Sequence, residues 1–362
     1  MGQSGPVPSK MGSCFGPLLL ACTPRTGWGA KESEATSPAS QLCYINSVVS
    51  PSCHRGSALG QYPPHHWIEE KSSGEGEQRE VPSFYSVSDS EIKSVSETLY
   101  AADVNRATSR EIVLNLQHKI SSDQTGAGQD YASQKLFSYV DEDALFSKPT
   151  FARLLALLNN YERMTGKEEA VTTSEKQEVD AFLDEIFKTQ VMEKLSQFFL
   201  SKGIYLSEND FKADLKEMWF GLYSRSKGAA MDSSGFEHVF HGEIKSGKIS
   251  GFHNWVHYYE LEKNGQINYL SYSYNGPWAG YPDIMAFQYR WTGYLKSVGS
   301  FFIGSSPEFE LAVYTLCYKT RPGKLCTLSL GGKSAQIQTY SWANSEYGAG
   351  KRYLASSYPN SP

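Results

Sequence analysis

The sequence has no long apolar run, few cysteines and no excess of positive charge. None of its apolar runs reaches 18 residues, so we expect no transmembrane helix. Six cysteines, with no C-x-x-C pair, are too sparse for a disulfide scaffold. A net charge of -5 and a pI near 6.0 argue against nucleic-acid binding through overall charge. Any RNA ligand must therefore meet a local basic site.

The first 85 residues differ in composition from the rest of the chain. Residues 1–85 are rich in Ser, Gly, Pro and Glu and lack helical or alternating periodicity, so we predict a disordered segment. A short apolar run that follows Lys10 resembles a weak signal peptide, which Pro17 interrupts. We therefore expect secretion, with a cytoplasmic or nuclear location as the alternative. The hydrophobic fraction of 40% leaves ample material for a folded core in 86–362.

Residues 86–230 are predicted to form a helical subdomain. Ser88 offers a capping residue before an acidic first turn and an apolar face, which predicts a helix of about four turns. Pro149 fits the first turn of a second helix with a strong apolar face. Helical spacing of apolar residues predicts two more helices, over 174–200 and 207–223.

Residues 231–362 are predicted to form a β-rich subdomain. Alternation predicts a half-buried strand over 266–274, and Ser306 followed by Pro307 predicts a helix over 307–318. Two strands are expected around a Gly-Gly turn, over 324–330 and 335–342. The fold class is therefore α+β. A disulfide between Cys317 and Cys326 is left open, because the sequence does not give their separation.

Four of the eight histidines are crowded into one stretch, which makes it the candidate site. They are His238, His241, His253 and His257. Histidine can both give and take a proton near neutral pH. His238 and His253 stand 15 residues apart in similar apolar settings, in FEHVF and GFHNW. This pattern predicts a pair of proton-transfer groups on two adjoining elements.

FEHVF, GFHNW and the later Lys296-x-x-x-Ser300 occur in an order and spacing that resemble the EndoU family of uridylate-selective endoribonucleases. The resemblance runs from about Ser86 to about Ser357. It implies a catalytic domain over 86–362, whose β-rich half holds an active-site cleft between its sheets. It also implies cleavage of single-stranded RNA at uridylates, which leaves a 2′,3′-cyclic phosphate, with stimulation by Mn²⁺.

The resemblance assigns the catalytic roles to His238, His253 and Lys296. Transfer of a phosphate to the 2′-hydroxyl needs a base, an acid and a cation for the charged phosphorane, which two histidines and a lysine supply. By analogy with other two-histidine ribonucleases, we expect His253 to be the base and His238 the acid. Family positions that contact uracil match Ser300, Thr339 and Tyr340.

Two other readings of this region remain open. The four histidines, as H-x2-H and H-x3-H, could hold zinc if both segments were helical. FEHVFHGEIK looks extended, however, which would place His238 and His241 on opposite faces. We expect His241 and His257 to be surface or packing residues. A non-catalytic, RNA-binding protein on the same fold is the second reading.

Glu237 and Glu243 flank the first catalytic histidine and are candidate Mn²⁺ ligands, because carboxylate oxygens suit that ion. The spacing also allows them to orient the imidazoles or to form plain salt bridges. The sequence has no long heptad repeat or exposed apolar stripe that would indicate a partner chain, so we expect a monomer.

Overall fold

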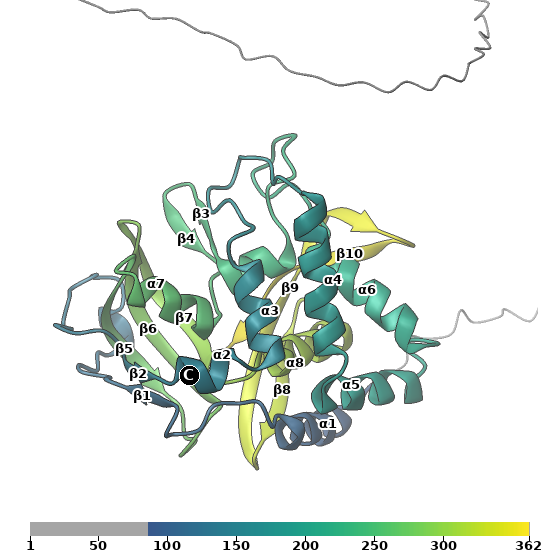
Figure 1. Ribbon diagram of the computed structural model, residues 1–362, viewed down its shortest axis with the longest axis horizontal. Coiled ribbons are helices and arrows are strands. Elements are labelled where there is room, and N and C mark those ends of the chain that lie inside the picture. Colours follow the sequence, from purple (N-terminus) through teal and green to yellow (C-terminus); the bar gives the residue numbers. More distant parts are fainter. Residues whose placement is uncertain (1–85, 362) are drawn as a thin grey trace, which may run out of the picture. The chain divides into compact units, whose positions relative to one another are not determined.

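The structure is a computed structural model, and it describes residues 86–361. The predictions for 1–85, of disorder and of a signal-like run, lie outside the described residues. The helices are α1 (Asp89–Ala102), η1 (Ser122–Gln124), α2 (Glu142–Phe146), α3 (Pro149–Leu157), α4 (Thr173–Ile186), α5 (Gln190–Ser201), α6 (Glu208–Phe220), η2 (Glu237–His241), α7 (Trp255–Lys263) and α8 (Pro307–Thr320). The strands are β1 (Ile112–Leu114), β2 (Phe137–Val140), β3 (Glu243–Lys245), β4 (Lys248–Ser250), β5 (Ile267–Asn275), β6 (Asp283–Trp291), β7 (Tyr294–Ile303), β8 (Leu325–Leu330), β9 (Lys333–Tyr347) and β10 (Lys351–Pro359). The α+β class is confirmed (Figure 1).

Helices α1, α3 and α8 begin at the residues that the sequence predicted. Ser88 and Glu91 form a reciprocal capping box at the start of α1, and Pro149 occupies the first turn of α3. The single helix predicted over 174–200 is wrong, because the structure has two helices there, α4 and α5. The hydroxyl of Thr189 accepts a hydrogen bond from the amide of Met192 and so begins a new helix.

The sequence did not predict the two-stranded β1–β2 sheet within the helical half or helix α7 within the β-rich half. Helix α7 begins because the side chain of Asn254 accepts a hydrogen bond from the amide of His257 at 3.0 Å. The aromatic residues of α7 favour strands, but here they pack against strand β5 and its sheet. Tertiary packing therefore overrides their local preference.

The β-rich half holds two antiparallel three-stranded sheets, in the orders β5-β6-β7 and β10-β9-β8, and the small two-stranded sheet β3-β4. Helix α8 is buried over almost its whole length, and it packs against α5, β9 and β10. In Figure 1 it lies beside β8 and β9, between the β5–β7 sheet and the helices α1, α5 and α6. Strands β7 and β10, from different sheets, approach each other. Among the described residues, every helix is too short or too polar to span a bilayer.

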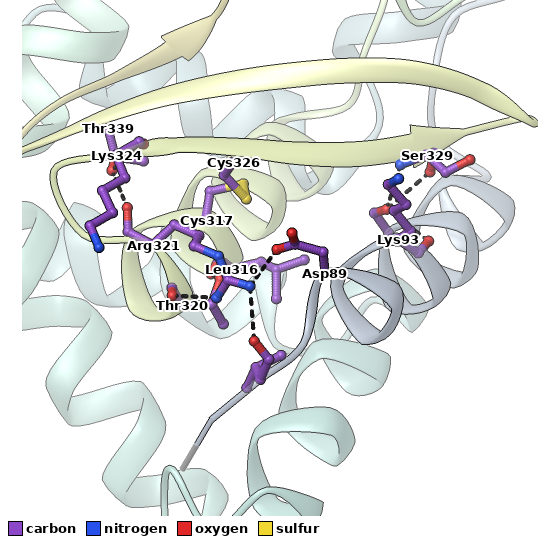
Figure 2. Close-up of a disulfide and its surroundings, with 12 residues drawn as sticks. Asp89, Lys93, Leu316, Cys317, Thr320, Arg321, Lys324, Cys326, Ser329 and Thr339 are labelled. Atoms are coloured by element: carbon purple, nitrogen blue, oxygen red, sulfur yellow. Dashed lines mark hydrogen bonds and ion pairs between the residues drawn. A yellow bond between two sulfur atoms is a disulfide. The ribbon is translucent and has the colours of Figure 1, made fainter. Parts of the chain in front are cut away.

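A disulfide joins Cys317 near the end of α8 to Cys326 on β8, as Figure 2 shows. Both cysteines are buried, and their Cα atoms are 5.5 Å apart. Arg321 follows α8 and hydrogen-bonds to the carbonyl of Val87 and to Asp89 at the start of α1. The end of α8 is thus fixed both to its neighbouring sheet and to the first described helix.

Candidate active site

A cleft of about 430 Å³ opens where β7 of one sheet meets β10 of the other. Its walls come from η2, the loop after β4, strand β7 and strand β10. The structure brings the three predicted catalytic residues, His238, His253 and Lys296, into this one cleft.

The segment Glu237–His241 is a turn of π-helix, so the prediction that it is extended is wrong. The rings of Phe236 and Phe240 are buried and stack 4.6 Å apart, at 7° to each other. An extended chain would separate these two residues by about 13 Å, so the stacking favours the helical turn. His238 and His241 nevertheless have different surroundings, since only His238 lines the cleft.

Backbone hydrogen bonds fix the loop that carries His253 directly to η2. The amide of Phe252 donates to the carbonyl of His238 at 2.8 Å, and the amide of His253 donates to the carbonyl of Val239 at 2.7 Å. Gly251 has φ +66°, and a Cβ there would lie 1.9 Å from the carbonyl oxygen of His238. Only glycine fits this close approach, which sets the spacing of the two histidines.

His253 is held as a neutral imidazole of one tautomer. Its Nδ1 lies 2.9 Å from the carbonyl oxygen of Ser300. A carbonyl only accepts hydrogen bonds, so Nδ1 carries the proton and Nε2 is left as an acceptor. Burial, and then the charge of Lys296, lower the pKa of His253 well below its ordinary value. The ring also stacks on Tyr358, with 4.7 Å between centroids. This geometry suits a proton acceptor.

His238 is oriented by a buried carboxylate. Its Nδ1 lies 2.7 Å from Oε2 of Glu243, and the same oxygen lies 3.2 Å from Nε of Arg225. Burial lowers the pKa of His238 to about 4, with Arg225 adding to this effect and Glu243 opposing it. Burial raises the pKa of Glu243, but His238 and Arg225 together outweigh burial and hold it below its ordinary value. Glu243 is therefore an anion that fixes the ring and favours its protonated form.

Lys296, on β7, supplies the positive charge of the cleft. Its ammonium group donates to the carbonyl of Gly251 at 2.8 Å. Burial lowers the pKa of Lys296 to about 8. Among the described residues that line the cleft, it is the only lysine or arginine. Near neutral pH the cleft thus holds one cation, placed beside the loop of His253.

The two carboxylates predicted as Mn²⁺ ligands do not fit that role. Glu237 is fully buried, and in the described part of the chain neither carboxylate oxygen has a hydrogen-bond partner. Burial, and then the charge of Glu243, raise the pKa of Glu237 to about 11, so it is protonated. One oxygen of Glu243 is engaged by His238 and Arg225. Within 86–361, no three His, Cys, Asp or Glu side chains are arranged to hold a metal ion.

His241 and His257 are packing residues of the interior, one of the two roles predicted for them. They are 7% and 5% exposed, and their ring centroids are 4.7 Å apart. Both rings also meet Trp291 edge to face. The described residues therefore do not form the four-histidine zinc site that was the alternative reading.

The three residues predicted to contact uracil lie in different places. Ser300 lines the cleft, and its carbonyl holds His253. Thr339 is fully buried, and its hydroxyl donates to the carbonyl of Arg321 at 2.9 Å. Tyr340 is 47% exposed. Consecutive strand residues point to opposite faces, so Thr339 and Tyr340 cannot both face a ligand in the cleft.

Three further residues of the site were not found from the sequence. Ser356 and Tyr358 line the cleft from β10, and Arg225 lies behind it against Glu243. The Ser-x-Tyr alternation places Ser356 and Tyr358 on one face of a strand. No local signal, however, says that this strand lies opposite β7, and none marks Arg225.

Comparison with known proteins shows which family this chain resembles. The family model described as Endoribonuclease XendoU matches residues 91–359. The chain is 65% identical to Uridylate-specific endoribonuclease D of Xenopus laevis over 275 residues, which cover 76% of this chain and 90% of that protein. It is 63% identical to Uridylate-specific endoribonuclease C of Xenopus laevis over 274 residues, with the same two coverages. A solved structure described as "The structure of XendoU: a splicing independent snoRNA processing endoribonuclease" matches with a TM-score of 0.62 and 38% identity, over 74% of this chain and 96% of that one.

Proposed function

The chain belongs to the XendoU family of endoribonucleases, and we propose that it cleaves single-stranded RNA at uridylates by transfer of the phosphate to the neighbouring 2′-hydroxyl. The 2′-oxygen forms a bond to phosphorus while the bond from phosphorus to the 5′-oxygen breaks. The products are a 2′,3′-cyclic phosphate and a 5′-hydroxyl, so the step is formally that of a lyase. The observation that carries the proposal is the pair of histidines with different protonation environments in one cleft.

His253 takes the proton from the 2′-hydroxyl. The bond from Nδ1 to the carbonyl of Ser300 leaves Nε2 as the acceptor, and the lowered pKa keeps the ring neutral near pH 7. A neutral imidazole with a fixed tautomer is the form that a general base requires. Stacking on Tyr358 holds the plane of the ring.

His238 gives a proton to the departing 5′-oxygen. Glu243 favours its imidazolium form, as the carboxylate does beside a catalytic histidine elsewhere. Burial, and then the charge of Arg225, lower the pKa of His238 to about 4. A phosphate bound in the cleft adds a second negative charge, which raises this pKa towards neutral pH and so favours the imidazolium form. The base therefore faces a backbone carbonyl and the acid faces a carboxylate, which supports the order His253 as base and His238 as acid.

Lys296 stabilises the negative charge that develops on the phosphorane. Its ammonium group is fixed by the carbonyl of Gly251 next to the loop of His253, so little reorganisation is needed during the reaction. The chain has a net negative charge, and Lys296 is the one cation in the cleft. Lys296 is therefore also the local basic site that RNA requires.

We assign uracil recognition to the walls of the cleft on β7 and β10. The hydroxyls of Ser300 and Ser356 are placed to read the edge of a pyrimidine, and Tyr358 offers an aromatic surface. Stacking tolerates any base, so selectivity for U over C must come from the hydroxyls or from backbone groups. Ser300→Ala should therefore reduce the ratio of cleavage at U to cleavage at C.

Manganese stimulation remains a proposal, and no step of the reaction is assigned to the ion. Because Glu237 and Glu243 do not fit an ion site, we propose that Mn²⁺ acts by binding to the RNA phosphates. Titration of the protein alone by calorimetry should then show no tight site, while cleavage still rises with Mn²⁺. A tight site on the protein would contradict this.

Secretion and a monomeric state are also proposals. The buried disulfide between Cys317 and Cys326 supports an oxidising compartment. Recovery of the full chain from the culture medium of expressing cells, and a single monomeric species in sedimentation, are the expected results. Retention of all the protein in the cytosol would refute the first, and a dimer would refute the second.

The decisive test uses an oligonucleotide with one uridine among adenosines. The protein should cleave it at the uridine and leave a cyclic phosphate, and His253→Ala should abolish this product. Binding without cleavage by the intact protein, from pH 6 to 8 with Mn²⁺ present, would instead support a non-catalytic RNA-binding protein on this fold.

A further inference from the structure

The loop that carries His253, which joins β4 to α7 and is called the base loop below, is attached to the turn between β7 and α8. The backbone of Asn254 forms an isolated parallel bridge with Phe302, near the end of β7. The indole of Trp255 donates to the carbonyl of Ser305 at 2.9 Å. The base loop is thus held from behind as well as by its contacts in the cleft.

Glu310, in the first turn of α8, completes this attachment. Its Oε2 accepts a hydrogen bond from Nδ2 of Asn254 at 3.3 Å, and its Oε1 accepts one from the hydroxyl of Ser305 at 2.6 Å. The other end of the Asn254 amide, Oδ1, accepts from the backbone amide of His257 and begins α7. Asn254 is therefore bound at both ends, to α7 by its oxygen and to α8 by its nitrogen.

These groups lie in the interior, where a missing hydrogen bond is costly. Glu310 and Ser305 are fully buried, and Asn254 is 1% exposed. Burial raises the pKa of Glu310 to about 8, although its hydrogen bonds to Ser305 and Asn254 oppose this. At pH 7 its carboxyl group is thus mostly neutral, and glutamine can replace it in shape and in hydrogen bonding. An apolar side chain could fill the same space without the cost of burying a carboxyl group, but it could not hold Asn254.

Glu310 and Asn254 are not among the described residues that line the cleft, so neither contacts a substrate there. Both act on the loop that carries the base. From these contacts we propose that Glu310 is a positioning residue for His253, because by holding Asn254 it fixes the base loop against the end of β7. The inference rests on the proposed function and extends it to a residue outside the cleft.

Loss of this hydrogen bond should change the environment of the His253 ring. The Nδ2 group of Asn254 would be left without a partner in the interior, so the base loop would move to find one. The ring of His253 would then be displaced from the carbonyl of Ser300, which now fixes its tautomer. Its Nε2 would no longer be held as the acceptor that a general base requires.

The test uses variants that leave every residue of the cleft unchanged. Glu310→Leu removes both hydrogen bonds but keeps the interior filled, whereas Glu310→Gln can keep them. Asn254→Ser retains a capping oxygen for α7 but is too short to reach Glu310. Glu308→Leu is the matched control, because Glu308 is also buried in the first turn of α8 but bonds to Asn105 at 2.6 Å instead of to the base loop.

The kcat for the single-uridine oligonucleotide should fall by about 10- to 100-fold in Glu310→Leu and in Asn254→Ser, as displacement of a catalytic group predicts. KM should stay the same, because the walls of the cleft are unchanged. The double variant should lose no more than the more affected single variant, since both changes remove one and the same bond. Glu310→Gln should keep the wild-type kcat.

Glu308→Leu should lose stability in urea but keep kcat. An equal loss of kcat in Glu308→Leu would mean that any destabilised α8 slows cleavage, and this would overturn the proposal. Losses that multiply in the double variant would overturn it as well. If Glu310→Leu does not fold, Asn254→Ser and Glu310→Gln decide, and an unchanged kcat in folded Asn254→Ser would contradict the proposal.

A second measurement does not depend on cleavage. Nitrogen NMR of the histidine rings should show His253 in the wild-type protein with its proton on Nδ1. Glu310→Leu should move both ring nitrogens towards the average of the two tautomers, and Glu308→Leu should not. An unchanged tautomer in Glu310→Leu would overturn the proposal. Absence of cleavage by the wild-type protein would refute the proposed function alone, because the tautomer still reports whether Glu310 positions the ring.

Discussion

Gly251→Ala tests whether the contact between the His253 loop and η2 sets the catalytic geometry. A Cβ at this position would lie 1.9 Å from the carbonyl oxygen of His238, and 2.9 Å from its Cδ2. Real Cβ contacts do not come below 3.0 Å, so the loop and η2 must separate by about 1 Å. The same loop carries the carbonyl that holds Lys296. The three groups proposed for catalysis, His238, His253 and Lys296, are thus displaced relative to one another.

The expected effect on the rate is large, and the effect on stability is moderate. A displacement of about 1 Å between catalytic groups lowers the rate on the order of 100-fold. Alanine at φ +66° adds about 1–2 kcal/mol of backbone strain to the folded state. Gly251→Ala should therefore fold with reduced stability and cleave the single-uridine oligonucleotide about 100 times more slowly.

Gly265→Ala is the matched control, because Gly265 has φ +70° but no atom within 4 Å of the added Cβ. It should show the same backbone strain in urea unfolding and an unchanged cleavage rate. Single-turnover kinetics separate the chemical step from binding. If Gly251→Ala cleaves within threefold of Gly265→Ala, the close approach does not set the geometry of the two histidines and our reasoning is wrong.

Three further predictions follow from the charges and the disulfide. Because burial lowers the pKa of Lys296 to about 8, its cation is present below that pH and lost above it. RNA binding by an inactive His253→Ala protein should weaken by up to about tenfold per pH unit above 8. A second change in the same protein, Lys296→Arg, should flatten this pH dependence. If Lys296→Arg leaves the pH dependence unchanged, Lys296 is not the group that titrates. Glu243→Gln removes the anion that raises the pKa of His238. The cleavage rate should therefore fall by about 10²- to 10⁴-fold, and the pH above which the rate declines should move to a lower value. An unmoved pH profile would mean that Glu243 only supports folding. Cys317→Ser opens a loop of sequence separation 9 and should lower the free energy of unfolding by about 2–3 kcal/mol, as should reductant on the wild-type protein; a wild-type urea curve insensitive to reductant would contradict this.

Local sequence signals predicted the elements whose ends are set by a few neighbouring residues. Ser88 begins α1 and Ser306 begins α8, because a side-chain oxygen within three residues satisfies a free amide. The break between α4 and α5 was missed, although Thr189 carries the same signal, because apolar spacing continued through it. Helix α7 and the π-helical turn η2 were missed because packing overrides the strand preference of their aromatic residues.

The α+β class and the short motifs that carry His238, His253 and Lys296 could be predicted from the chain alone, because their order and spacing are local properties. The surroundings of each of these groups, however, depend on contacts between distant segments. The carbonyl of Ser300 selects the tautomer of His253 from 47 residues away, and Tyr358 reaches the cleft from β10. Such contacts arise where two sheets meet, and burial at that junction shifts every pKa involved. No pattern along the chain records which strands will face each other.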